Sequence, residues 1–152
     1  MDRSEKLKWY KKEFGDISNE IKNKNTISHY EFLRIRNFKL QNLSTETEEN
    51  VQKITKEAFE LAKEDKIEEA IKELLKLNGV AIPIASTILA LKFSEKYAII
   101  DKRVINALGK EEWLKDYLDN PATYQSYLIL LRENSKENNI SLRDYERELF
   151  EK

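Results

Sequence analysis

Turn-forming residues are scarce in this sequence, which has three glycines and two prolines among its 152 residues. A β-sandwich or β-barrel needs many tight turns, and glycine and proline are the residues that mark them. The rest of the chain is rich in Glu, Lys, Leu, Ile and Ala, which favour helices. Its 40% of hydrophobic residues can build a core and argue against wholesale disorder. The sequence therefore predicts an all-α fold.

Composition also excludes several kinds of site. The chain has no cysteine and one histidine, so we expect no disulfide framework, no iron–sulfur cluster and no metal centre. No apolar run approaches the roughly 20 residues that cross a bilayer, and the N-terminus lacks the apolar region of a signal peptide. We therefore expect a soluble, cytoplasmic protein without a membrane partner. A net charge of −1 argues against a protein that coats nucleic acid nonspecifically.

Hydrophobic periodicity predicts eight to ten helices in a single domain over 1–152. Ser28 and Glu31 form one capping-box pattern and Thr45 and Glu48 another, and Gly15 is expected to end the first helix. Residues 83–92 are apolar nearly all round, which predicts a helix at the centre of the fold. The expected helices span 4–14, 28–40, 45–62, 67–77, 83–92, 101–108, 110–118, 120–131 and 141–150.

The segment 67–92 has the spacing of a helix-hairpin-helix. Gly79 supplies the unusual backbone angles of the turn, and the small residues Ala85 and Ser86 let the two helices approach closely. The free N–H groups at the start of the second helix can bind a phosphate without side-chain charge. An ordinary turn between two helices is the alternative. The hairpin residues expected to contact DNA are Asn78, Gly79, Val80, Ala81 and Ile82, and Gly79→Val is expected to weaken binding without unfolding the domain.

This part of the chain resembles a known family. Leu77-x-Gly79-Val80, Ala85-Ser86-x-Ile88-Leu89 and Ile99-Ile100-Asp101-x-x-Val104 are similar to the signature of the helix-hairpin-helix DNA glycosylases, the HhH-GPD superfamily. The resemblance is close over about 40 residues, and the C-terminal helices over 110–151 resemble only loosely those of small members. It implies a two-lobed helical domain of the base-excision-repair type that binds damaged or mismatched DNA.

The resemblance also implies roles for single residues. Asp101 corresponds to the essential aspartate of the family, with a structural N-cap as the alternative. Lys102 and Arg103 are expected to contact the DNA backbone, with a solvated first helical turn as the alternative. Pro83 stands where bifunctional members carry a Schiff-base lysine, which implies a monofunctional N-glycosylase. No cofactor is required, although hairpin carbonyls in the family can hold a cation. Candidates for a pocket that stacks a flipped base, with core packing as the alternative, are Trp9, Tyr10, Tyr30 and Tyr97.

A second interpretation keeps the fold without the chemistry. Pro83, Ala81 in place of the second hairpin glycine, and Asn106 in place of a basic residue all depart from the family pattern. They favour a non-catalytic helical module that binds DNA or a protein. The basic residues Arg34, Arg36 and Lys39 are expected either to line a groove or to form a solvated helix face.

Overall fold

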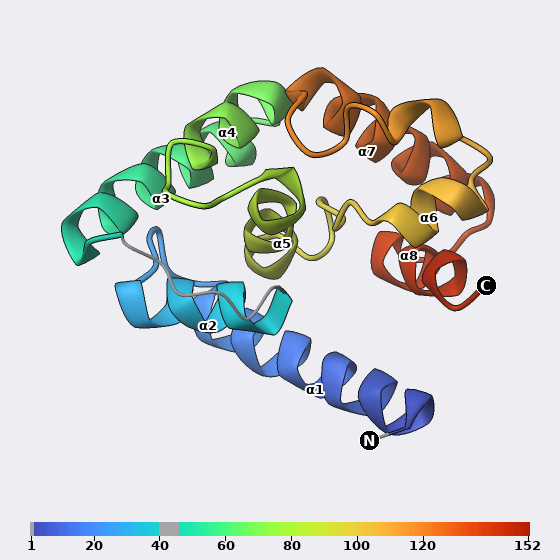
Figure 1. The fold of residues 1–152 in the computed structure, drawn as a ribbon, viewed down its shortest axis with the longest axis horizontal. Coiled ribbons are helices and arrows are strands. Elements are labelled where there is room, and N and C mark those ends of the chain that lie inside the picture. The colour runs from blue at the N-terminus through green and yellow to red at the C-terminus, as the bar shows by residue number, and fades with distance from the viewer. Residues whose placement is uncertain (1, 40–45) are drawn as a thin grey trace.

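The computed structural model describes residues 2–39 and 46–152, without the side chains of residues 37–39. The described part contains α-helices, one short 3-10 helix and no strand (Figure 1). The elements are α1 (Arg3–Ile21), α2 (His29–Lys39), α3 (Glu48–Lys63), α4 (Ile67–Leu74), α5 (Ile82–Lys92), α6 (Lys102–Ala107), η1 (Glu111–Trp113), α7 (Pro121–Glu137) and α8 (Leu142–Phe150). The predicted all-α class is confirmed.

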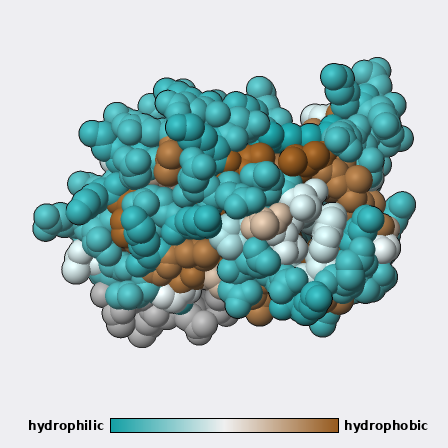
Figure 2. Space-filling view, turned by 90° about the horizontal axis from the view of Figure 1, so that it is seen from above, coloured by the Kyte–Doolittle hydropathy of each residue, from teal (hydrophilic) through white to brown (hydrophobic). Residues whose placement is uncertain are grey.

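Helix α5 lies in the middle of the molecule, with the other helices arranged around it (Figure 1). It contacts α1, α2, α3 and α4, and every one of its residues from Ile84 to Leu91 is buried. This confirms the predicted central helix. Its start differs from the expectation by one residue, because Ala81 is the N-cap and Pro83 the second helical residue. In the face seen from above, the surface is mostly hydrophilic with separate apolar patches (Figure 2).

Helix α1 is longer than predicted, because it continues through Gly15 to Ile21. The apolar stripe of Tyr10 and Phe14 extends at helical spacing to Ile17 and Ile21, and the last three are buried. The gain from burying these side chains exceeds the cost of about 1 kcal/mol for a glycine inside a helix. Gly15 was therefore wrongly predicted as a stop.

The predicted helix starts are mostly confirmed. Ser28 and Glu31 form the expected capping box, with bonds of 2.9 and 3.0 Å. At α3 the cap is Thr47, which accepts from the Asn50 N–H, whereas the predicted Thr45 and the predicted end of α2 at residue 40 lie outside the described residues. The predicted helix over 110–118 is wrong: it contains only the 3-10 turn η1, followed by further turns.

The second half of the connector between α5 and α6, residues 97–100, is buried although it belongs to no helix. Residues 97–100 are at most 1% exposed. Buried backbone groups need hydrogen-bond partners, and here side chains from other helices supply them. The Tyr124 and Tyr127 hydroxyls donate to the carbonyls of Ala98 and Ile99 at 2.8 and 2.7 Å.

Two backbone N–H groups of the connector are also satisfied by side chains. Ile99 donates to the Glu146 carboxylate at 3.2 Å, and Ile100 donates to the Ser86 hydroxyl at 3.0 Å. Glu146 is itself 5% exposed and is paired with Arg143 at 3.0 Å. Helices α5, α7 and α8 thus hold the connector in one position, and with it the residue that follows, Asp101.

Replacing Ser86 by alanine tests this arrangement. Ser86→Ala leaves the buried Ile100 N–H without its acceptor, which should cost about 1–3 kcal/mol of the free energy of unfolding. Ser135→Ala is the matched control, because Ser135 is also buried but its hydroxyl only donates back to the Arg132 carbonyl in its own helix. Urea unfolding of the two variants should show the larger loss for Ser86. Equal losses would contradict the account.

Candidate nucleic-acid interface

The turn between α4 and α5 buries its apolar side chains in the core and exposes the residues between them. Leu77, Val80 and Ile82 are buried, whereas Asn78 and Gly79 are exposed. Gly79 has φ +73°, a left-handed angle that side chains rarely adopt. Ala81 has φ −100°, so the turn does not need a second glycine there. Alanine in place of the second hairpin glycine therefore does not strain the backbone of the hairpin.

Some N–H groups of the hairpin already have acceptors within the protein. The Asn78 N–H donates to a carboxylate oxygen of Glu46 at 2.6 Å, and the Ile82 N–H donates to the Leu118 carbonyl at 2.9 Å. The Val80 N–H donates to the Leu77 carbonyl at 3.3 Å. Among the described residues, the N–H groups of Gly79 and Ala81 have no acceptor. Of the five predicted contact residues, these two present free backbone donors.

Glu46 places a negative charge at the hairpin. Its carboxylate is buried and accepts hydrogen bonds from the Asn78 N–H, the Asn50 amide and the Thr47 N–H. Burial alone would raise the pKa of Glu46, but the bonds from Asn50, Asn78 and Thr47 outweigh it and lower the pKa. Sequence reasoning missed this residue, because Glu46 and Asn78 are 32 positions apart and no periodicity joins them.

Arg36 lies against the same turn, and this contact bears on the effect expected of Gly79→Val. Its guanidinium donates to the Gly79 carbonyl at 3.1 Å, and a Cβ added to Gly79 would meet the Arg36 Nη2 at 2.4 Å. A side chain at residue 79 would therefore both strain the backbone and displace Arg36. Gly79→Val is therefore expected to lower the free energy of unfolding as well as DNA binding.

Asp101 is the N-cap of α6, as predicted. Its carboxylate accepts from the Arg103 N–H at 2.7 Å, and the residue is half-buried. A carboxylate at a helix N-terminus interacts favourably with the positive end of the helix dipole. Its charge also reaches Tyr10, whose pKa is raised to about 12 first by burial, with Glu146 and Asp101 acting in the same direction. Asp101 thus lies where α6 meets α1 and α8.

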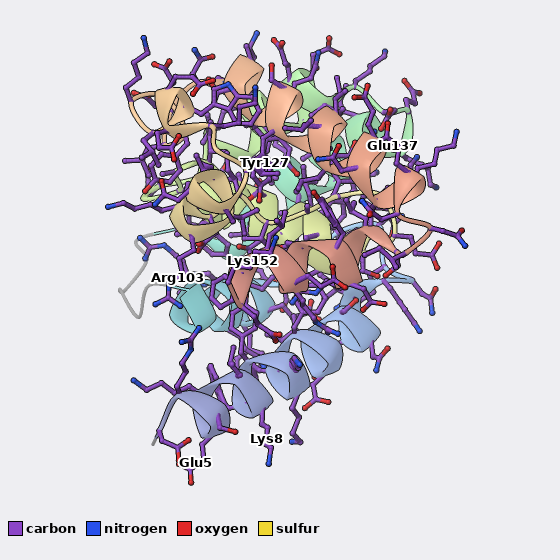
Figure 3. All side chains as sticks on the ribbon, turned by 90° about the vertical axis from the view of Figure 1, so that its right-hand side faces the viewer. Glu5, Lys8, Arg103, Tyr127, Glu137 and Lys152 are labelled. Atoms are coloured by element: carbon purple, nitrogen blue, oxygen red, sulfur yellow. The ribbon has the colours of Figure 1, made fainter. Side chains whose placement is uncertain are left out.

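Positive side chains lie beside Asp101. Lys102 and Arg103 are exposed, and the Arg103 guanidinium lies 5.2 Å from the centre of the Phe150 ring. Arg103 also lines an open hollow of about 600 Å³ together with Arg3 and Lys152. Arg103 and Lys152 are seen near each other at this edge of the molecule (Figure 3). This edge can attract an anionic chain.

The hairpin and Asp101 are attached to the same helix. Ile82 opens α5, and one turn later Ser86 accepts from the N–H of Ile100, the residue before Asp101. Four residues of a helix span about 6 Å along its axis. The turn with its free N–H groups and the connector that carries Asp101 are therefore fixed to neighbouring turns of α5.

The aromatic candidates do not form one pocket. Tyr97 is 1% exposed and its hydroxyl donates to the Ala62 carbonyl at 2.8 Å, so it belongs to the core and offers no ring face to a base. Tyr10 is half-buried and stacks on Phe150, with ring centres 6.2 Å apart. Trp9 and Tyr30 are exposed on α1 and α2.

The three basic candidates of α2 have different surroundings. Arg34 is paired with Glu13 at 3.0 Å and Glu20 at 2.6 Å, so its charge is largely compensated. Arg36 contacts the hairpin as described, and the side chain of Lys39 lies outside the described residues. Of the two whose side chains the structure describes, Arg36 is the one that contacts the hairpin.

Comparison with known proteins adds no assignment: no family model, curated protein or solved structure matches the chain. Within the described residues, acidic and histidine side chains form no cluster of three or more suited to a metal ion. No helix in the same part of the chain combines the length and apolarity needed to cross a membrane.

The lowered pKa of Glu46 makes a prediction about stability and pH. The ionised carboxylate stabilises the fold above its unfolded pKa, and this stability is lost as the pH falls through the lowered pKa of the folded state. Glu46→Gln should therefore cost about 1–3 kcal/mol at neutral pH, and this deficit should shrink in acid. Chemical unfolding over a pH series measures it.

The matched control is Glu49→Gln, which removes the same charge from an exposed neighbour in α3. It should change the free energy of unfolding by less than about 0.5 kcal/mol. A Glu46→Gln deficit that stays constant down to acidic pH would show that the carboxylate charge does not stabilise the hairpin.

Proposed function

We propose that this protein binds DNA through the α4–α5 hairpin and acts in base excision as a monofunctional DNA N-glycosylase. One observation carries the proposal: the hairpin, with its two free N–H groups, and the N-capped Asp101 are fixed to adjacent turns of α5. The resemblance of residues 77–104 to the helix-hairpin-helix glycosylases supports the same assignment. The substrate class is a duplex with a damaged or mismatched base.

DNA binding of this kind would involve few charged side chains. The Gly79 and Ala81 N–H groups would donate to a DNA phosphate, and Lys102 and Arg103 would contact the backbone beside it. Affinity should fall with salt with a modest slope, on the order of two to four released counterions. A net charge of −1 agrees with such a small number of contacts.

The chemistry would centre on Asp101. After the base is rotated out of the stack, the bond between the sugar C1′ and the base nitrogen breaks, and the base leaves with the electron pair. The ionised Asp101 stabilises the positive charge that develops on the sugar, as carboxylates do in glycoside hydrolysis. Water then adds to C1′ and gives up a proton to the carboxylate. That proton passes to the departed base anion, so that the free base, an abasic site and an ionised Asp101 remain. Proline has no amine, so Pro83 cannot form a Schiff base.

The decisive variant is Asp101→Asn. Asparagine caps helices about as well as aspartate, so stability should change little, but the neutral amide can neither stabilise the sugar cation nor accept a proton. We expect excision to fall by at least a hundredfold, consistent with a typical 10²–10⁴-fold contribution from a positioned acid or base. The assay uses duplexes with uracil, a thymine mismatch, 8-oxoguanine, an alkylated purine or hypoxanthine, followed by alkaline cleavage.

Asp2→Asn is the control for this variant. Asp2 is also an aspartate N-cap, which accepts from the Glu5 N–H at 2.8 Å in α1. It should retain full excision and the same duplex affinity. Full activity in Asp101→Asn would remove Asp101 from the mechanism, and no excision by the unmodified protein on any duplex would favour the second function below.

A non-catalytic binding module on the same fold is the second candidate. It is favoured by Glu46, whose carboxylate already occupies the Asn78 N–H at the hairpin. This negative charge would repel a DNA phosphate at the turn. A module of this kind would bind DNA weakly or bind a protein, and Asp101 would act only as a cap.

Glu46→Gln distinguishes these functions through DNA affinity. If the hairpin binds phosphate, removing the competing charge should tighten duplex binding several-fold at low salt, measured by fluorescence anisotropy. Glu49→Gln removes an equal charge nearby and should change the affinity less than twofold. An unchanged affinity in Glu46→Gln, with the fold intact, would exclude the hairpin as the DNA contact.

A further inference from the structure

A hollow of about 490 Å³ opens at the C-terminal end of α5, away from the hairpin. The loop 22–25, helix α3 and the end of α5 form its walls. Ten residue steps separate the two ends of α5, which is about 15 Å along the helix axis. The hollow is therefore separate from the proposed DNA interface.

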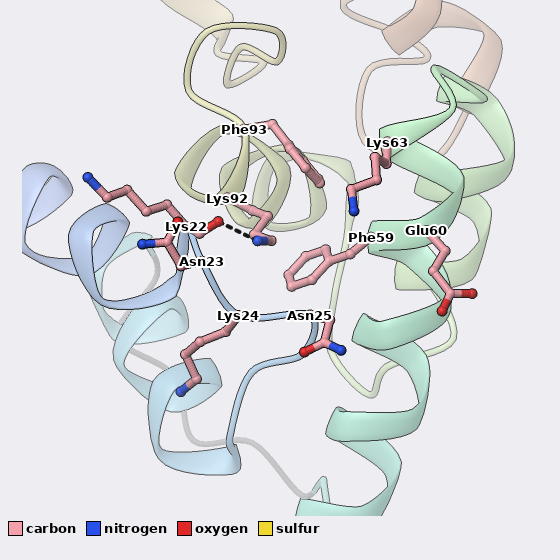
Figure 4. A pocket seen from close by; sticks show the side chains of 9 residues that line it. All are labelled: Lys22, Asn23, Lys24, Asn25, Phe59, Glu60, Lys63, Lys92 and Phe93. Carbon is pink, nitrogen blue, oxygen red and sulfur yellow. Dashed lines mark hydrogen bonds between the residues drawn. The ribbon is translucent and has the colours of Figure 1, made fainter.

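Two lysines point into this hollow. Figure 4 shows the ammonium groups of Lys63 and Lys92 directed toward its centre, whereas the side chains of Lys22 and Glu60 point away. Lys24, which also borders the hollow, is paired with Glu31 at 2.5 Å. Among the described residues, neither Lys63 nor Lys92 has a carboxylate within ion-pair distance. Two like charges therefore face the same space without a counter-charge.

Lys92 is held in a fixed position. Its Nζ donates to the Lys22 carbonyl at 2.5 Å and lies 5.6 and 5.4 Å from the ring centres of Phe59 and Phe93. Burial, followed by the charge of Lys63, lowers the pKa of Lys92. An anion bound in the hollow would offset the repulsion between the two ammonium groups. The Phe93 ring, which is half-buried, provides an apolar wall beside the two charges.

Lysines in the last turn of a helix also offset the negative end of the helix dipole. Lys63 and Lys92 each occupy such a position, in α3 and α5. That role needs only a charge near the helix end. It does not require two ammonium groups directed into one hollow with an aromatic wall.

We propose that this hollow binds a small phosphate monoester that carries a flat apolar group. Lys63 and Lys92 would contact the phosphate as point charges, and the apolar group would lie against Phe93. The volume suits a small organic molecule rather than a macromolecule. The site is independent of the proposed DNA interface.

Phenyl phosphate is the probe, with inorganic phosphate and phenol as its two halves. Calorimetry on the full chain should show phenyl phosphate binding at least fivefold tighter than inorganic phosphate, with phenol not binding. Lys63→Met and Lys92→Met should each weaken phenyl phosphate binding at least fivefold. Lys22→Met removes a charge at the rim that points away, and should change the affinity less than twofold.

Lys92→Met also removes the bond to the Lys22 carbonyl, so its fold is checked by circular dichroism. Lys63→Met breaks no hydrogen bond within the described residues and keeps the test valid if Lys92→Met unfolds. Absence of phenyl phosphate binding at millimolar concentration would overturn the proposal. So would equal affinity in Lys63→Met and the unmodified protein, because the lysines would then serve only the helix ends.

Discussion

The burial of α5 on all sides is the constraint on which the rest of the structure depends. A helix that is apolar all round must be covered on every side, and α1, α2, α3 and α4 provide much of that cover. The chain then continues from the end of α5 to α6 through residues 97–100, which are buried. Because these residues belong to no helix, side chains supply hydrogen-bond partners to their backbone, from Ser86, Tyr124, Tyr127 and Glu146.

This arrangement links stability to the candidate site. The same hydrogen bonds that allow the connector to be buried also fix the start of α6, where Asp101 is the N-cap. At the other side of the site, Glu46 and Arg36 hold the hairpin by its N–H and carbonyl groups. A phosphate that binds the hairpin would have to tolerate or displace Glu46. In the proposed function, the competition between the Glu46 carboxylate and the phosphate would set the affinity of the hairpin for DNA.

Local sequence signals predicted the fold well. The Ser28 box, the Asp101 cap and the apolar segment 83–92 act over a few residues, and each is found where it was expected. Gly15 failed as a stop because the apolar stripe continues past it. Contacts distant in sequence were not predictable: Glu46 reaches Asn78 and Tyr97 reaches Ala62 only after the helices have packed. The hairpin could be proposed from spacing and Asp101 from the family resemblance, but not the groups that surround them.

The central claim is that the hairpin and the start of α6 form one DNA-binding surface carried by α5. Amide chemical shifts measured by NMR during titration with a short duplex at low salt test it most directly. We expect one set of amide shifts to change together with a single affinity, those of Gly79, Ala81, Lys102 and Arg103. The amide shifts of Lys63 and Asn25, which line the hollow beside the C-terminal end of α5, should stay unchanged. If the amide shifts of the hairpin and of α6 do not change at a saturating concentration of duplex, the shared DNA-binding surface is contradicted.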